Sequence, residues 1–186
     1  MRSQVPIFLD RDGVLLELVQ DCAGLRAARS LDEYQLIRNV DKAIDGLHDN
    51  FLLIVITNQP DIAKNKVSLD MVNQINNKLM RDIPRISEIL VCPHSEDDKC
   101  NCRKPKPGLV FEFFARYNYI TESGWMIGDR WVDIEAGINA KLRTILIKKH
   151  YSWDRTSSGV PSNDTIPNLI CSSLDESLKL ISRTLM

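Results

Sequence analysis

Short, continuous apolar runs alternate along the chain with longer amphipathic stretches. The apolar runs predict strands over residues 5–9, 51–56, 86–92, 125–127, 144–147 and, more weakly, 169–170. Continuous rather than alternating apolar character is typical of parallel strands that are covered on both faces. The amphipathic stretches predict helices over residues 41–50, 68–82, 108–117, 133–140 and 174–184. This alternation predicts an α/β fold, a Rossmann-like parallel sheet with helices on both faces.

Two polar segments, 20–38 and 152–168, fit neither pattern, and we expect both to be loops. The chain has 186 residues, of which 44% are hydrophobic and 26% charged, and this suits one domain with a substantial core. We therefore predict that residues 1–186 form a single domain. Only about 45 residues separate Asp12 from Thr57, so we expect no large cap domain.

The charge of the chain is balanced, with 24 Lys and Arg against 25 Asp and Glu. A net charge of -1 provides no overall attraction to nucleic acid or to an anionic membrane. Residues 1–6 lack a basic segment followed by an apolar run, and no stretch approaches the roughly 20 apolar residues of a membrane span. We therefore expect a cytoplasmic protein, and we predict a monomer without nucleic-acid or membrane partners.

Polar and charged residues directly follow the predicted strands. Asp10 and Asp12 follow the first, Thr57 closes the second, and Asp129 follows the strand at 125–127, while Lys104 precedes the third helix. Ligands bind beyond the carboxyl ends of parallel strands, so these groups should meet at one edge. Converging carboxylates need a cation, and hard oxygen ligands favour Mg²⁺. With a hydroxyl and a lysine to bind an anion, the set predicts phosphoryl transfer.

Each of these residues also has an ordinary explanation. Thr57 could simply end a strand, Lys104 could be a solvated charge, and Asp129 could be a helix N-cap. Their order along the chain is the specific signal. Residues 8–14, 56–59, 102–108 and 126–133 resemble the four motifs of the haloacid dehalogenase-like phosphatases. The likeness is strongest to the branch that contains D-glycero-D-manno-heptose 1,7-bisphosphate phosphatase and the histidinol-phosphatase domain, and it extends from about residue 6 to about residue 147.

The resemblance implies a catalytic role for four residues. Asp10 would be the nucleophile that forms an aspartyl-phosphate, and Asp12 would act as general acid and then general base. Thr57 and Lys104 would hold phosphoryl oxygens. Substrate contacts are implied for a further set: Gly13, Asn58, Gln59, Arg103 and Arg130.

The resemblance also implies the ligands of the catalytic Mg²⁺. These would be Asp10, the backbone carbonyl of Asp12 and Asp129, which would offset repulsion between the anions. Asp133 would orient Lys104 or a metal-bound water.

A cysteine-rich segment at about 92–102 predicts a second metal site. Cys92, His94, Cys100 and Cys102 form the ligand set of a structural Cys₃His zinc site. The alternative is a group of buried free thiols beside a surface histidine. The same branch of phosphatases is known for such a zinc-binding loop. Because Cys102 directly precedes Arg103 and Lys104, a Zn²⁺ here would shape the rim of the active site without taking part in the reaction.

The motifs predict the reaction better than the substrate. Segments 15–19 and 60–62 differ from the pattern of the heptose phosphatases, although no catalytic carboxylate, threonine or lysine is lost. We expect a sugar phosphate such as D-glycero-D-manno-heptose 1,7-bisphosphate, with histidinol phosphate or a polynucleotide 3'-phosphate as alternatives. A phosphoacceptor signalling domain would instead place its acceptor Asp after a middle strand. A non-enzymatic, zinc-stabilised phosphate-binding module would be expected to lack Asp10 or Asp12.

Overall fold

A six-stranded parallel sheet organises the chain. The structure is a computed structural model that describes residues 4–119 and 124–183. The strands lie in the order β5-β4-β1-β6-β7-β8, and every neighbouring pair is parallel. Their bounds are β1 Val5–Leu9, β4 Phe51–Asn58, β5 Ile86–Cys92, β6 Trp125–Gly128, β7 Arg143–Ile147 and β8 Leu169–Cys171. All six predicted strands are confirmed, with ends that differ by one or two residues.

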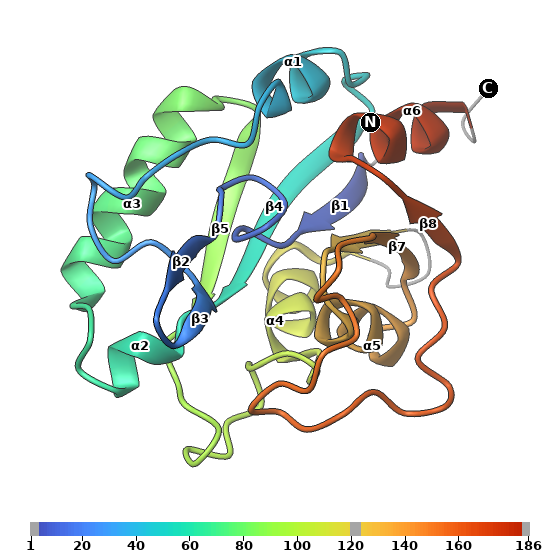
Figure 1. The fold of residues 1–186 in the computed structure, drawn as a ribbon. Helices are drawn as coiled ribbons and strands as arrows, with labels where there is room; N and C mark the ends of the chain where they lie inside the picture. The colour runs from blue at the N-terminus through green and yellow to red at the C-terminus, as the bar shows by residue number, and fades with distance from the viewer. Residues whose placement is uncertain (1–3, 120–123, 184–186) are drawn as a thin grey trace.

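Helices cover both faces of this sheet, as the pattern predicts (Figure 1). One face packs against α1 (Val40–Asp45), α3 (Leu69–Asp82) and α6 (Leu174–Arg183), and the other against α4 (Gly108–Tyr117) and α5 (Trp131–Asn139). Successive residues of a strand point to opposite faces, so Ile7 and Leu9 belong to the first core while Phe8 belongs to the second. Phe8 meets Phe113 of α4 edge to face at 5.5 Å between ring centroids.

Two predicted segments are corrected by the structure, and one short helix was missed. The helix expected at 41–50 is shorter, because α1 ends at Asp45 and Gly46 forms its C-cap. Segment 20–38 is not only loop, since β2 (Val19–Asp21) and β3 (Gly24–Arg26) form an antiparallel hairpin beside the sheet. A short helix, α2 (Pro60–Ala63), follows β4 and was not predicted. In the helix expected at 174–184, Thr184 lies outside the described residues.

The strand order places one sheet position at a reversal of direction. From the central β1 the chain builds β4 and β5 on one side, then crosses to β6, β7 and β8 on the other. Ligands of open α/β sheets bind at such a switch point, beyond the carboxyl end of the strand. Figure 1 shows the β2–β3 hairpin, the segment between β5 and α4, and the segment between β7 and β8 gathered at this end. Asp10, the residue after β1, therefore lies where these segments meet.

Candidate active site

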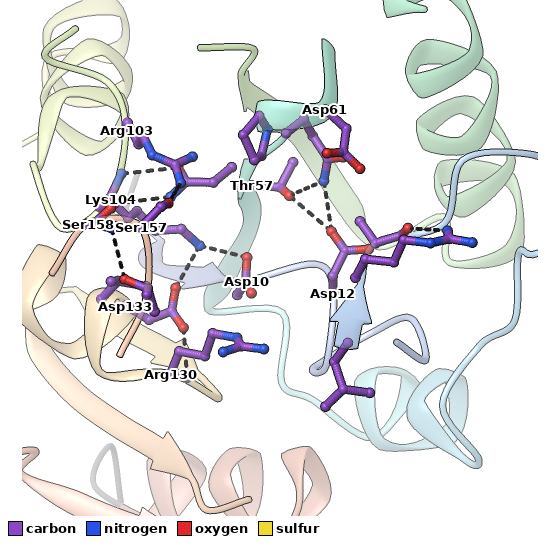
Figure 2. Close-up of a pocket in the computed structure, with 18 of the residues that line it drawn as sticks. Asp10, Asp12, Thr57, Asp61, Arg103, Lys104, Arg130, Asp133, Ser157 and Ser158 are labelled. Carbon is purple, nitrogen blue, oxygen red and sulfur yellow. Dashed lines mark hydrogen bonds and ion pairs between the residues drawn. The ribbon is translucent and has the colours of Figure 1, made fainter. Parts of the chain in front are cut away.

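Lys104 lies between two carboxylates at this end of the sheet. Its Nζ is 2.6 Å from Asp10 Oδ1 and 2.7 Å from Asp133 Oδ1, and it also donates to Ile56 O at 2.9 Å (Figure 2). Burial alone would lower the pKa of Lys104, but the charges of Asp10 and Asp133 raise it above its ordinary value. Lys104 therefore stays protonated, although only 2% of the residue is exposed.

Asp10 is a buried carboxylate on the floor of a cavity. It is 8% exposed, and burial raises its pKa to about 7. Lys104 opposes this rise, whereas the charges of Asp133 and Asp12 add to it. The negative charge of ionised Asp10 is poorly solvated at this depth, and a further cation beside it would lower its pKa.

The Asp12 carboxylate is held by donors from three directions. Gln59 Nε2 donates to Asp12 Oδ2 at 2.8 Å, and Thr57 Oγ1 at 3.3 Å. Arg11 donates through Nε at 3.1 Å and through Nη2 at 3.2 Å. Arg11 is fully buried, and its Nη1 donates to Asn76 Oδ1 on α3 at 2.7 Å. Asp12 is thereby fixed beside Asp10 without taking part in the Lys104 ion pairs.

Asp133 links Lys104 to the start of α5. Its Oδ2 accepts a hydrogen bond from the backbone N–H of Arg130 at 3.0 Å, while Oδ1 pairs with Lys104. Asp133 is 1% exposed, and each of its oxygens has a contact within the protein. The ion pair places Asp133 where it could orient Lys104, which is one of the two roles that the resemblance implies for it.

The carboxylates of Asp10, Asp129 and Asp133 form a group suited to a hard cation. One oxygen from each lies within 4.8 Å of the others. Asp129 is 0% exposed, and among the described residues neither of its oxygens accepts a hydrogen bond of ordinary geometry. Burial raises the pKa of Asp129 well above its ordinary value, Asp10 and Asp133 add to the rise, and the nearby Tyr151 hydroxyl only partly opposes it. Uncompensated buried oxygens of this kind fit Mg²⁺.

Gly13 makes room for the Asp129 carboxylate. Its φ is +95°, and a Cβ at this position would lie 2.1 Å from Asp129 Oδ2. Only glycine combines this backbone conformation with so close an approach. Gly13 lies outside the cavity that contains Asp10, so the structure gives it this packing role, and not a lining position.

The four predicted zinc ligands come together at the end of β5, with Cys92 on the strand and the other three in the segment that follows it. Their ligand atoms all lie within 4.8 Å of one another. Cys92 Sγ is 3.7 Å from Cys100 Sγ and 3.2 Å from Cys102 Sγ, and His94 Nδ1 is 3.3 Å from Cys102 Sγ. Tetrahedral Zn–S bonds of about 2.3 Å put neighbouring sulfurs about 3.8 Å apart. The donor set therefore fits Zn²⁺, and all five cysteines are free thiols.

A cavity of about 310 Å³ opens above Asp10. The predicted residues that line it are Asp10, Asp12, Thr57, Asn58, Gln59, Arg103, Lys104 and Arg130. Asn58 uses its amide group within the protein, donating to Lys104 O at 3.1 Å and accepting from Lys104 N at 3.1 Å. Gln59 likewise donates to Asp12 and to Thr57. Both amides therefore fix neighbouring residues that line the cavity.

Several residues of the site were not found from the sequence. Arg11 and Asn76 brace Asp12, and they are 65 residues apart. Two further walls of the cavity come from the β2–β3 hairpin and from residues 155–158. Arg29 fastens the hairpin side to α2 through Asp61, at 2.7 Å. Arg11 lies within the motif at 8–14 and Asn76 within the predicted helix at 68–82, but nothing in the sequence paired them. Arg29 and residues 155–158 lie outside the motifs, so no signal distinguished them from solvated polar residues.

Comparison with known proteins identifies the family of this chain. A family model described as HAD-hydrolase-like matches residues 101–176. The D-glycero-beta-D-manno-heptose-1,7-bisphosphate 7-phosphatase of Neisseria meningitidis is 31% identical over 135 residues, which cover 70% of each chain. The enzyme of that name from Pasteurella multocida is 31% identical over 154 residues, which cover 76% of this chain and 80% of the relative. The chain belongs to the haloacid dehalogenase-like phosphatases.

Further relatives of this phosphatase agree with the assignment. The histidine biosynthesis bifunctional protein HisB of Legionella pneumophila is 30% identical over 166 residues, covering 83% of this chain and 44% of the relative. Among solved structures, the D,D-heptose 1.7-bisphosphate phosphatase from B. bronchiseptica, complexed with magnesium and phosphate, superposes with a TM-score of 0.79. The aligned region covers 97% of this chain and 99% of the B. bronchiseptica chain, and the two are 24% identical. This likeness supports the fold assigned to the present chain. Among the described residues of the present chain, no helix is long and apolar enough to cross a bilayer.

Proposed function

We propose that this phosphatase hydrolyses a phosphate monoester through an aspartyl-phosphate on Asp10, with Mg²⁺ as cofactor. The observation that carries the proposal is the placement of two carboxylates with different surroundings on one cavity floor. Asp10 is paired with Lys104, whereas Asp12 is held by Gln59, Thr57 and Arg11. One carboxylate is thus placed to attack phosphorus, and the other to transfer a proton.

In the first half-reaction, an oxygen of Asp10 forms a bond to phosphorus while the bond to the leaving oxygen breaks. Asp12 gives that oxygen its proton, and the alcohol departs. Thr57 and the ammonium group of Lys104 bind phosphoryl oxygens as negative charge builds up on them. Asp10, Asp129 and the backbone carbonyl of Asp12 would hold Mg²⁺, which when bound would neutralise charge between nucleophile and phosphate.

In the second half-reaction, a water molecule attacks the aspartyl-phosphate. Asp12 accepts a proton from this water, and the bond between phosphorus and the Asp10 oxygen breaks. Inorganic phosphate leaves, Asp10 is again a carboxylate, and Asp12 is again protonated. Splitting one difficult displacement into two gives each half an acid or base already in place.

The substrate we propose is a sugar phosphate, with D-glycero-D-manno-heptose 1,7-bisphosphate as the first candidate. The names of the Neisseria and Pasteurella relatives support this choice. Histidinol phosphate is the second candidate, and the 30% identity to HisB of Legionella pneumophila favours it. We also propose that Cys92, His94, Cys100 and Cys102 hold a structural Zn²⁺. The monomeric state and the cytoplasmic location stay predictions from the sequence.

The test is turnover of a panel of phosphate esters with Mg²⁺ present. The panel contains both anomers of the heptose bisphosphate, histidinol phosphate and a DNA oligonucleotide with a 3'-phosphate. We expect hydrolysis of the sugar bisphosphate and its loss in Asp10→Asn, with Asp45→Asn, an exposed aspartate on α1, as the matched control. Release of phosphate by folded Asp10→Asn protein at the wild-type rate would contradict the covalent mechanism.

A further inference from the structure

The turn at residues 155–158 lines the cavity and belongs to none of the motifs. We propose that Arg155 on this turn binds a second anionic group of the substrate, so that the enzyme selects small esters with two anionic ends. This inference rests on the proposed phosphatase function and concerns which esters the same cavity accepts. Three observations lead to it: the anchoring of the turn, the unequal charge of the two cavity walls, and the size of the cavity.

The segment before Arg155 is anchored to the motif that follows β6. Ser152 Oγ donates to Asp129 O at 2.6 Å, and Ser152 O accepts from Trp131 N at 2.9 Å. The indole Nε1 of Trp131 donates to Asp154 O at 3.0 Å. These bonds join residues 152–154 to the start of α5, so the backbone that leads to Arg155 has a defined position.

The segment after Arg155 is anchored to the motif that precedes α4. Thr156 and Gly159 exchange two backbone hydrogen bonds, at 2.9 and 3.0 Å, and close a tight turn. Within it, Ser157 Oγ accepts from Arg103 Nη2 at 2.9 Å (Figure 2). Ser158 Oγ donates to Lys104 O at 3.4 Å. Arg155 thus lies between two anchors, each of which is attached to a catalytic motif.

The arginines of the cavity fall into two groups. On the hairpin side, Arg26 pairs with Asp21 at 2.7 Å and with Glu33 at 2.6 Å, and Arg29 pairs with Asp61 at 2.7 Å. These guanidinium groups are already neutralised by carboxylates of the protein.

On the opposite side, Arg103, Arg130 and Arg155 line the cavity, and none forms an ion pair with the described residues. Arg130 stacks on the Tyr151 ring at 4.6 Å, and the buried Nε of Arg103 has no hydrogen-bond partner among the described residues. Guanidinium groups without a carboxylate are free to donate to a phosphate or carboxylate of a ligand. This wall therefore carries positive charge that is not paired with a carboxylate of the protein at ion-pair distance, and an anionic ligand could neutralise it.

The scissile phosphate cannot use all of this charge. In the proposed mechanism its oxygens are bound by Thr57 and Lys104, while Arg155 lines the cavity from the turn at 155–158. A volume of about 310 Å³ is at the lower end of the range for small-molecule sites. A molecule of sugar size, with one phosphate at Asp10 and another anionic group near Arg155, matches both features.

The experiment compares ligands that share the scissile phosphate and differ in the distal one. Binding of D-glycero-D-manno-heptose 1,7-bisphosphate and of the 7-phosphate is measured by calorimetry with Mg²⁺, in Asp10→Asn protein that cannot turn them over. We expect the bisphosphate to bind about 10-fold more tightly, and Arg155→Gln to remove most of this preference. Arg38→Gln, which removes an exposed arginine outside this cavity, should keep it.

Two results would overturn the role of Arg155. One is an equal affinity for the two ligands, and the other is a preference that survives in folded Arg155→Gln protein. Binding in Asp10→Asn protein does not depend on turnover, so failure of the proposed reaction would appear separately, as wild-type protein that releases no phosphate. Arg155→Lys should recover part of the preference, because it keeps the charge and loses the fork of donors.

Discussion

The ammonium group of Lys104 lies 2.6 Å from Asp10 Oδ1, although 94 residues separate the two in the chain. A second carboxylate, that of Asp133, lies 2.7 Å from the same ammonium group, and all three residues are buried. Two buried carboxylates without a counter-charge would repel each other strongly. Lys104 therefore stabilises the fold and also holds Asp10 and Asp133 together in the site.

We predict that Lys104→Met lowers the free energy of unfolding by about 3 kcal/mol in metal-free protein and abolishes turnover, because two buried carboxylates lose their counter-charge. Chemical denaturation of the variant measures the first effect. Lys179→Met removes a solvent-exposed pair with Asp175 at 2.6 Å and should cost less than about 1 kcal/mol. Adding Asp133→Asn to Lys104→Met should recover part of the lost stability. Equal costs for Lys104→Met and Lys179→Met would refute this account.

A second prediction concerns the brace behind Asp12. Asn76→Ala removes the partner of Arg11 Nη1 and leaves a buried donor unsatisfied, which costs about 1–3 kcal/mol of stability. The freed guanidinium also holds Asp12 less firmly, so we expect kcat to fall several-fold while KM changes little. Steady-state kinetics and denaturation check both parts. The neighbouring Asn77 is exposed, and Asn77→Ala serves as the control that should change neither quantity. A variant with unchanged kcat would show that Arg11 needs no brace.

The raised pKa of Asp10 predicts how the stabilisation of the protein by Mg²⁺ depends on pH. Burial raises the pKa of Asp10 from an ordinary value of 3.8 to about 7, so folding favours its protonated form. This contribution to stability is fully present below pH 3.8 and is lost as the pH rises through about 7. Mg²⁺ binds the ionised carboxylates and should offset that loss, so it should stabilise the protein more at pH 8 than at pH 5.

With Mg²⁺ at about 100 times its Kd, we expect Tm to rise by about 5–10 °C at pH 8 and by much less at pH 5. Thermal unfolding with and without Mg²⁺ at the two pH values gives the comparison. Asp129→Asn should reduce the difference, whereas Asp45→Asn should not. The same Mg²⁺ effect at both pH values would mean that protons and Mg²⁺ do not compete at this site.

The last prediction separates the two metals. Purified protein should contain close to one Zn²⁺ per chain, bound through folding itself, whereas Mg²⁺ should exchange readily. A weak chelator should stop turnover, and added Mg²⁺ should restore it. Cys100→Ser should lower Tm by about 10 °C or more, while Cys22→Ser, at an exposed thiol, should leave it unchanged. Zinc-free wild-type protein with an unchanged Tm would remove the structural role of the cluster.

The sequence by itself determined the architecture and predicted the candidate reactive groups. Continuous apolar runs predicted six buried strands, because a strand covered on both faces has no solvated side to mark with polar residues. The order of polar residues at the strand ends predicted Asp10, Asp12, Thr57 and Lys104 at one edge, because parallel strands end together. The spacing of three cysteines and a histidine predicted the metal-binding loop. Each of these signals is local.

Only the tertiary structure decided which residues hold the candidate reactive groups in place and which segments line the cavity around them. The hairpin in segment 20–38 brings Arg26 into ion pairs with Asp21 and Glu33, and such ion pairs leave no periodic trace in the sequence. Arg11 is as polar as any surface residue until Asn76, 65 residues away, satisfies it in the interior. The turn at 155–158 acquires a role only where it meets Arg103. Contacts between distant segments depend on the completed fold, so neither composition nor spacing reveals them.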